Sequence, residues 1–215
     1  MESLVLAMVR KPTGESVRGD HVHPGLTLTT APVDVVAMSL LDALLVGHGV
    51  TVRITEVEAY AGPRDPASHA YVRTPRSEIM YGPAGRLYVY RIHGHHCANV
   101  VTGPDGEASA VLVRAGEVIA GFDVARERRG GVADAALARG PGNLARALGI
   151  TAADLGADLG GPEPVALRFP AQPVSAARLH SGPRVGVRRA ADVAWRFWIA
   201  DDPTVSAYRR HPRAQ

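Results

Sequence analysis

The sequence predicts a single α+β domain, built on a largely antiparallel mixed sheet with flanking helices. Two patterns indicate this class: a strongly periodic helix precedes short strands joined by hairpin turns, and strands and helices do not alternate regularly. The length of 215 residues suits one domain, and a hydrophobic content of 46% is enough for one core. We assign residues 1–28, which lack periodicity, to a loosely ordered N-terminal extension and residues 29–215 to the domain itself.

The first expected element is an amphipathic helix. Apolar residues between positions 33 and 45 recur at the i, i+3, i+4, i+7 spacing of one helix face. Thr29 or Thr30 can cap its start, and Gly47-His48-Gly49 predicts its end. The spacing therefore predicts a helix that runs almost to the first strand.

A strand over residues 50–60 follows, and its composition is unusual. Strict alternation gives one face to Ile54, Glu56, Glu58 and Tyr60. Two carboxylates make a poor core face, so we interpret them as candidates for a general base at the end of a strand. The alternative is a surface salt bridge with a nearby arginine, and the residues alone do not choose between Glu56 and Glu58.

The later elements are a long loop followed by short strands and helices. Residues 61–85 are rich in Gly, Pro, Ser and Arg, which is typical of a functional or disordered loop. The Gly-Pro-Asp-Gly sequence at 103–106 predicts a hairpin turn, and Gly-Pro-Gly at 140–142 opens a short helix that Gly149 ends. The other expected elements are strands over 86–93, 97–102, 108–114, 165–169, 184–188 and 195–200, and a helix near 117–128.

Three of the six tyrosines stand on two strands that can be neighbours, although aromatic residues are scarce in this chain. They are Tyr60, Tyr88 and Tyr90. An aromatic core cluster would explain them. Their proximity to the two carboxylates favours a slot in which a flat ring stacks.

Arginine carries almost all the positive charge, because Lys11 is the only lysine. A codon preference explains the choice of arginine over lysine. The clustering of arginines is a separate feature, and it indicates either a solvated face or a phosphate-binding surface. The clustered residues are Arg73, Arg76, Arg86 and Arg91.

The sequence His-Gly-His-His-Cys at 93–97 contains zinc donors, but Cys97 is the only cysteine. This excludes a zinc ribbon, and an extended strand would point His95 and His96 to opposite faces. We expect no metal and no other cofactor, and a histidine-dependent metal hydrolase stays as an alternative. The chain contains neither a phosphate-binding P-loop nor a G-x-S-x-G nucleophile elbow.

The single cysteine also excludes an intrachain disulfide framework and suits a reducing compartment. No uninterrupted apolar run is long enough to span a bilayer. We therefore expect a cytoplasmic protein that does not associate with membranes.

Several motifs occur together in a fixed order. They are E-V-E-A-Y-A-G-P at 56–63, D-P-A-S-H at 65–69, T-P-R at 74–76, M-Y-G-P-A-G-R-L-Y-V-Y at 80–90, C-A-N-V at 97–100, V-L-V-R-A at 111–115, R-G-P-G-N-L-A-R-A-L-G-I at 139–150, R-V-G-V at 184–187 and R-F-W-I at 196–199. From about residue 30 to near its end, the chain resembles the 3-methyladenine (alkyladenine) DNA glycosylase family. The resemblance implies the methylpurine-DNA glycosylase fold, which is similar to the C-terminal domain of formyltransferases.

The resemblance further implies a monomeric bacterial enzyme, acting at the nucleoid, on double-stranded DNA that contains damaged purines. Such an enzyme flips an alkylated or deaminated purine out of the duplex and hydrolyses its N-glycosidic bond. 3-Methyladenine, 7-methylguanine, hypoxanthine and ethenoadenine are all implied substrates, and the sequence does not rank them. A lyase would need an amine nucleophile, and Lys11 in the extension is the only lysine, so we expect hydrolysis alone.

The matching positions carry implied roles. Glu58 matches the general base that activates water, and Arg114 matches the arginine that helps to hold that water and the flipped nucleotide. The residues implied to enclose the flipped base are Tyr60, His69 and Tyr90. Asn99 matches the asparagine that excludes normal guanine. The residues implied to contact DNA or to fill the gap in the duplex are His93, His95, Met80 and Arg76. The role of Glu56 stays open.

The chain departs from the family pattern at one hairpin tip. The family usually has a tyrosine where this chain has His93, and the tip is one residue shorter before Asn99. Any of His93, His95 and His96 can then take the wedge position. A non-catalytic nucleic-acid-binding module of the same fold is the alternative to an enzyme, and the presence of Glu58 argues against it.

Overall fold

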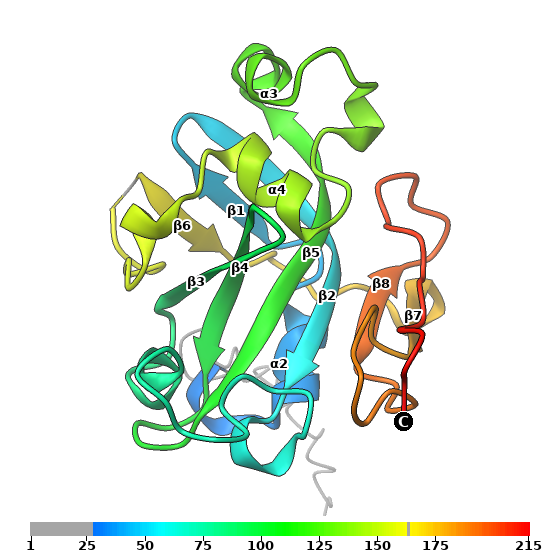
Figure 1. The fold of residues 1–215 in the computed structure, drawn as a ribbon. Coiled ribbons are helices and arrows are strands. Elements are labelled where there is room, and N and C mark those ends of the chain that lie inside the picture. Colours follow the sequence, from blue (N-terminus) through cyan, green and yellow to red (C-terminus); the bar gives the residue numbers. More distant parts are fainter. Residues whose placement is uncertain (1–27, 163) are drawn as a thin grey trace, which may run out of the picture.

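Eight strands form one antiparallel sheet in the computed structural model, which describes residues 28–162 and 164–215 (Figure 1). The strands are β1 (Leu44–Gly47), β2 (Val50–Tyr60), β3 (Leu87–Ile92), β4 (His95–Thr102), β5 (Ser109–Ala120), β6 (Val165–Arg168), β7 (Leu179–Gly182) and β8 (Arg196–Ile199). Their order is β3-β4-β5-β2-β1-β6, with β8 pairing to β2 and β7 to β8. The expected α+β domain with an antiparallel sheet is confirmed.

Helices and short 3₁₀ turns surround the sheet in the described part of the chain, where residues 28–30 are also helical. The others are α2 (Val33–Ser39), α3 (Phe122–Arg129) and α4 (Pro141–Leu148), with η1 (Gly62–Arg64), η2 (Glu78–Tyr81), η3 (Asp134–Ala136), η4 (Ala152–Asp154) and η5 (Ala176–Arg178). Helix α4 packs over β4 and β5, and Gly149 ends it in the left-handed conformation, as its sequence predicts (Figure 1). In the described ranges, no helix combines the length and the apolar character needed to cross a membrane.

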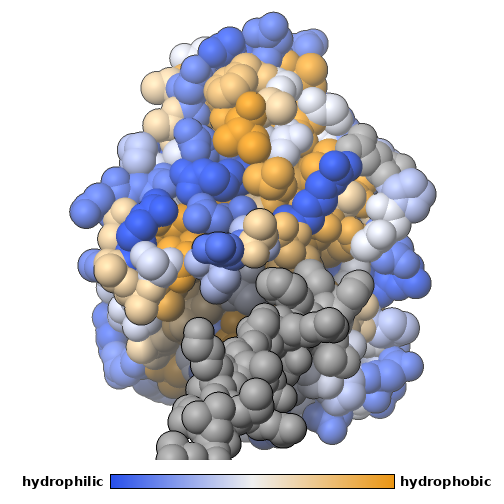
Figure 2. Space-filling view, turned by 180° about the vertical axis from the view of Figure 1, so that it is seen from behind, coloured by the Kyte–Doolittle hydropathy of each residue, from blue (hydrophilic) through white to orange (hydrophobic). Residues whose placement is uncertain are grey.

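One main core lies between the sheet and its helices. It contains Val36 and Leu40 of α2, Val57 of β2, and Leu144 and Leu148 of α4. The view from behind shows apolar side chains at the surface among hydrophilic ones, as is usual in folded proteins (Figure 2). The expected N-terminal extension lies outside the described residues, except for its last residue, Leu28, which is buried in the core.

The expected first helix is too long. Helix α2 ends at Ser39, its N-cap is Pro32 rather than a threonine, and residues 44–47 form β1. Asp42 turns the chain with a left-handed φ of 63°, and β1 then pairs with β2 on one side and β6 on the other. These long-range pairings override the helical spacing of the leucines.

Two other expectations along the chain are wrong. The helix near 117–128 begins only at Phe122, because β5 continues to Ala120 beside β2. Gly116 permits this close approach, since a Cβ there would lie 2.4 Å from the Arg53 carbonyl oxygen. Residues 184–188 do not form a strand, and β8 pairs with β2 and β7.

Bulges in β2 and β5 change which side chains share a face. Pairing passes from Ile54 opposite Gly116 to Glu56 opposite Ala115, and Thr55 is the extra residue on β2. The next step leaves Arg114 as the extra residue on β5. Ile54 therefore lies in the core and not, as strict alternation predicts, beside Glu56.

Candidate active site

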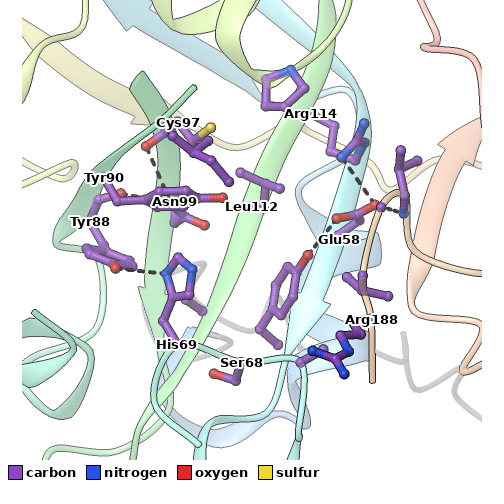
Figure 3. Close-up of a pocket in the computed structure, with 18 of the residues that line it drawn as sticks. Glu58, Ser68, His69, Tyr88, Tyr90, Cys97, Asn99, Leu112, Arg114 and Arg188 are labelled. Carbon is purple, nitrogen blue, oxygen red and sulfur yellow. Dashed lines mark hydrogen bonds and ion pairs between the residues drawn. The ribbon is translucent and has the colours of Figure 1, made fainter. Parts of the chain in front are cut away.

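One cavity of about 600 Å³ brings together the six residues that the sequence motifs place at the reaction centre and base pocket. They are Glu58, Tyr60, His69, Tyr90, Asn99 and Arg114, of which all but Tyr60 are labelled in Figure 3. These residues come from β2, the loop after it, β3, β4 and β5. A cavity of this size suits a small flat ligand.

Glu58 lines the cavity but has no solvent-exposed surface. Its Oε1 accepts a hydrogen bond from the backbone N–H of Val185 at 2.7 Å and lies 3.3 Å from Arg114 Nη1. Its Oε2 accepts a hydrogen bond from the Tyr60 hydroxyl at 2.8 Å (Figure 3). Oε1 is therefore saturated, whereas Oε2 can accept one more hydrogen bond.

Tyr60 stays protonated and serves as a donor to Glu58. Burial, followed by the charge of Glu58, raises the pKa of the Tyr60 hydroxyl well above its ordinary value. The guanidinium of Arg184 lies 4.7 Å from the centre of the Tyr60 ring. Tyr60 is thus held at its hydroxyl and at its ring.

Glu56 is fully buried, and it does not line the cavity. Its Oε1 accepts hydrogen bonds from Arg114 Nε at 3.0 Å and Arg196 Nε at 2.6 Å. The Ser206 hydroxyl donates to the same oxygen at 3.0 Å, and the Ser206 backbone N–H donates to Oε2 at 2.8 Å. Of the two neighbouring carboxylates, only Glu58 borders the cavity.

Arg114 connects the two carboxylates. Its Nε donates to Glu56, its Nη1 faces Glu58, and its Nη2 donates to the Ser206 hydroxyl at 3.3 Å. Burial opposes its charge, but Glu58 and Glu56 outweigh burial and raise the pKa of Arg114 above its ordinary value. Arg114 is a permanent cation with a fixed orientation.

His69, Tyr88 and Tyr90 form an aromatic wall of the cavity. The rings of His69 and Tyr90 meet edge to face with centroids 4.5 Å apart, and those of Tyr88 and Tyr90 lie 5.7 Å apart. His69 Nδ1 and the Tyr88 hydroxyl are 3.0 Å apart (Figure 3). These three rings therefore present an aromatic surface to the cavity, and its use as a stacking slot stays a prediction.

Arg76 lies at the exposed edge of this wall. Its guanidinium carbon is 5.2 Å from the centre of the Tyr90 ring, and its Nη2 is 3.3 Å from His69 Nε2. Partial burial of the ring, followed by the charge of Arg76, lowers the pKa of His69 to about 4, although part of the side chain stays exposed. His69 is therefore neutral at pH 7.

Two of the other clustered arginines form ion pairs. Arg73 pairs with Glu78, and Arg86 pairs with Asp158, both at the surface. These pairs match the interpretation of a solvated face. Arg76 instead contacts the aromatic wall of the cavity, through Tyr90 and His69.

The β3–β4 hairpin turns over His93 and Gly94, whose φ values are 48° and 83°. Ile92 and His93 line the cavity, and Ile92 is 45% exposed. His95 instead packs against α4. A Cβ added to Gly142 of that helix would lie 2.8 Å from the Cβ of His95. The structure brings His93 to the cavity but turns His95 toward the helix.

Met80 requires a correction. Its side chain is 2% exposed and packs with Tyr88 in a small core beside the cavity. A buried side chain is not at the surface position that a DNA contact requires. Met80 is therefore part of the cavity wall.

Sequence reasoning missed the segment 185–189, which lines the cavity opposite the aromatic wall. It contributes the backbone N–H of Val185 and the exposed side chains of Arg189 and Arg188, the latter labelled in Figure 3. Alternation suggested a strand here, yet Gly186 adopts a φ of 68°. That glycine within the R-V-G-V motif was the available signal for a turn.

Among the residues that the structure describes, no three His, Cys, Asp or Glu side chains are grouped closely enough to hold a metal ion. The histidines of the hairpin tip are therefore not gathered in the way that the alternative of a metal hydrolase requires.

Comparison with known proteins agrees with the motifs. The family model described as methylpurine-DNA glycosylase (MPG) matches residues 27–203. A Nocardia farcinica protein named "Putative 3-methyladenine DNA glycosylase" is 54% identical over 187 residues, which cover 83% of this chain and 88% of that relative. A relative of the same name in Frankia casuarinae is 51% identical over 203 residues, which cover 88% of this chain and 95% of the relative. Another in Mycobacterium tuberculosis is 52% identical over 187 residues, which cover 83% of this chain and 90% of the relative. This chain belongs to the methylpurine-DNA glycosylase family.

Proposed function

We propose that this protein excises methylated purines from double-stranded DNA, using a water molecule that Glu58 activates. The position of Glu58 carries the proposal. It is the one carboxylate among the described residues that line the cavity, and its Oε2 keeps an acceptor position. Water attached there can attack C1′ of a nucleotide whose base occupies the cavity.

The proposed reaction is a simple hydrolysis. The water oxygen bonds to C1′ as the N-glycosidic bond breaks, and the electrons of that bond leave with the base. Glu58 accepts the proton that the water loses. A methylated purine that carries a positive charge leaves as a neutral base, so its departure needs less assistance than that of a normal purine.

The aromatic wall supports base flipping. Extrusion of a base from the duplex costs a few kcal/mol and costs least for a damaged base. Stacking against His69 and Tyr90 of this wall, and against Tyr60, offsets part of this cost. A cationic ring is attracted to the faces of these aromatic side chains. Because His69 is neutral, this wall adds no positive charge of its own.

The rim of the cavity supplies the DNA contacts in this proposal. Arg76, Arg188 and Arg189 can neutralise phosphates, which positions the duplex without reading its sequence. Ile92 and His93 lie at the exposed end of the β3–β4 hairpin, where they can fill the gap left by the flipped base. We propose a monomer, as expected for an enzyme that scans DNA.

The test is single-turnover base release from duplex oligonucleotides that carry 3-methyladenine, 7-methylguanine, hypoxanthine or ethenoadenine, with EDTA present. Glu58→Gln preserves the side-chain volume and runs beside the wild type. We expect release by the wild type and a loss of at least about 100-fold in the variant. Binding to lesion duplex without any release would support the alternative of a binding module.

A further inference from the structure

Glu56 and Ser206 have no part in the proposed reaction, yet they surround Arg114. Glu56 is fully buried, and Ser206 lies in the C-terminal segment, just beyond the part of the chain that the family model matches. The two side chains contact each other, and each contacts a different nitrogen of Arg114. We propose that Glu56 and Ser206 are positioning residues that aim the Arg114 guanidinium at Glu58.

The hydrogen bonds define one orientation of Arg114. Nε is held by Glu56 at 3.0 Å and Nη2 by the Ser206 hydroxyl at 3.3 Å. With these two corners held, the third, Nη1, faces Glu58 Oε1 at 3.3 Å. A planar guanidinium held at two corners cannot rotate at the third.

The charges of this cluster require Glu56. Glu56, Glu58, Arg114 and Arg196 form a buried group of two negative and two positive side chains. Without the Glu56 charge, Arg196 would lose its carboxylate partner, and Arg114 would keep only Glu58. Arg114 Nε would then have no acceptor, and the guanidinium would no longer be held at two corners.

Ser206 is fixed in place by the segment that carries it. Arg139 Nη2 donates to the Pro203 carbonyl, and Arg196 Nη2 donates to the Ser206 carbonyl at 2.7 Å. The Thr204 hydroxyl is 2.8 Å from that of Thr55, at the bulge of β2. The segment is therefore docked independently of the Ser206 hydroxyl.

This inference rests on the proposed function, and Ser206→Ala tests it. We expect the single-turnover rate of base release to fall roughly 10-fold, because small misplacements of a reacting group are costly. The dissociation constant for lesion duplex stays within about twofold, because Ser206 does not line the cavity. Ser206→Thr keeps the hydroxyl and restores the rate.

Two further variants separate positioning from docking. Thr204→Val removes a buried hydroxyl of the same segment that contacts neither Glu56 nor Arg114, and we expect it to leave the rate close to that of the wild type. In an Arg114→Lys background, Ser206→Ala causes no further slowing, because both changes remove the same arrangement. Additive effects would overturn the proposal.

The outcomes distinguish this inference from the proposed function. If the wild type is active, Glu58→Gln is inactive and Ser206→Ala is unchanged, only the inference fails. It also fails if Thr204→Val slows the reaction as much as Ser206→Ala. If Glu58→Gln releases base as fast as the wild type, the proposed function fails and the inference fails with it.

Discussion

Arg184 and Asp65 form a fully buried ion pair that joins two walls of the cavity. Arg184 Nη1 donates to Asp65 Oδ2 at 2.5 Å, and Nη2 donates to Oδ1 at 2.9 Å, with side chains 0% and 1% exposed. Arg184 directly precedes Val185, which donates to Glu58, and Asp65 begins the loop that carries His69. The pair therefore fixes the distance between these walls.

We expect Asp65→Asn to lower the free energy of unfolding by about 3–5 kcal/mol, because it leaves the Arg184 charge buried and only partly compensated. Urea denaturation followed by circular dichroism measures this loss. The matched control is Asp192→Asn, which breaks an exposed pair with Arg210 and should leave the unfolding midpoint unchanged. Equal effects of the two substitutions would contradict the structural role of the buried pair.

The stability of the protein should depend on the protonation of His69. Its folded-state pKa of about 4 lies below the unfolded value of about 6.5. Between these values the unfolded chain binds a proton that the folded chain does not bind. The free energy of unfolding therefore falls as the pH drops from about 6.5 to about 4. Urea midpoints across this range should fall less steeply for His69→Asn than for the wild type.

Arg76→Ala should raise the pKa of His69, because it removes a nearby positive charge. The pKa should stay below its ordinary value, since packing against the wall is the larger cause of the shift. NMR titration of the His69 ring signals measures both effects. A wild-type His69 that titrates near its ordinary value would show that the wall does not shield it.

The Tyr90 ring, rather than its hydroxyl, should bind the base. Tyr90→Phe keeps the ring against His69, so the dissociation constant for lesion duplex should change little. Tyr90→Leu removes the stacking surface and should weaken lesion binding by about 1–3 kcal/mol. Fluorescence anisotropy with lesion and undamaged duplexes separates this loss from general DNA binding. A large loss in Tyr90→Phe would instead indicate a direct role for the hydroxyl.

The hairpin tip should matter for lesion binding through the residues that border the cavity. Ile92→Ala and His93→Ala should each reduce lesion affinity, because they shorten the group that fills the gap in the duplex. Ile119→Ala changes an isoleucine of similar exposure that does not line the cavity, and it should have no effect. His95→Ala should also have little effect, since His95 packs on α4. A larger effect from His95 would reverse this assignment.

Much of the architecture followed from local patterns in the sequence. Alternation predicted β2, Gly-Pro-Asp-Gly predicted the β4–β5 hairpin, and Gly149 predicted the end of α4, because each depends on a few neighbouring residues. The motifs also named six residues that the fold then brought into one cavity. What these residues do stays a prediction until base release is measured.

Only the tertiary structure decided how the two carboxylates of β2 differ. The residues alone could not separate Glu56 from Glu58, because partners of Glu56 come from Arg196 and Ser206, at the other end of the domain sequence. Bulges that arise from pairing with β5 moved Ile54 into the core, and the same pairing set Arg114 beside both glutamates. Local periodicity predicts which side chains of a strand share a face. Strand pairing and burial between distant segments determine which residues that face contacts.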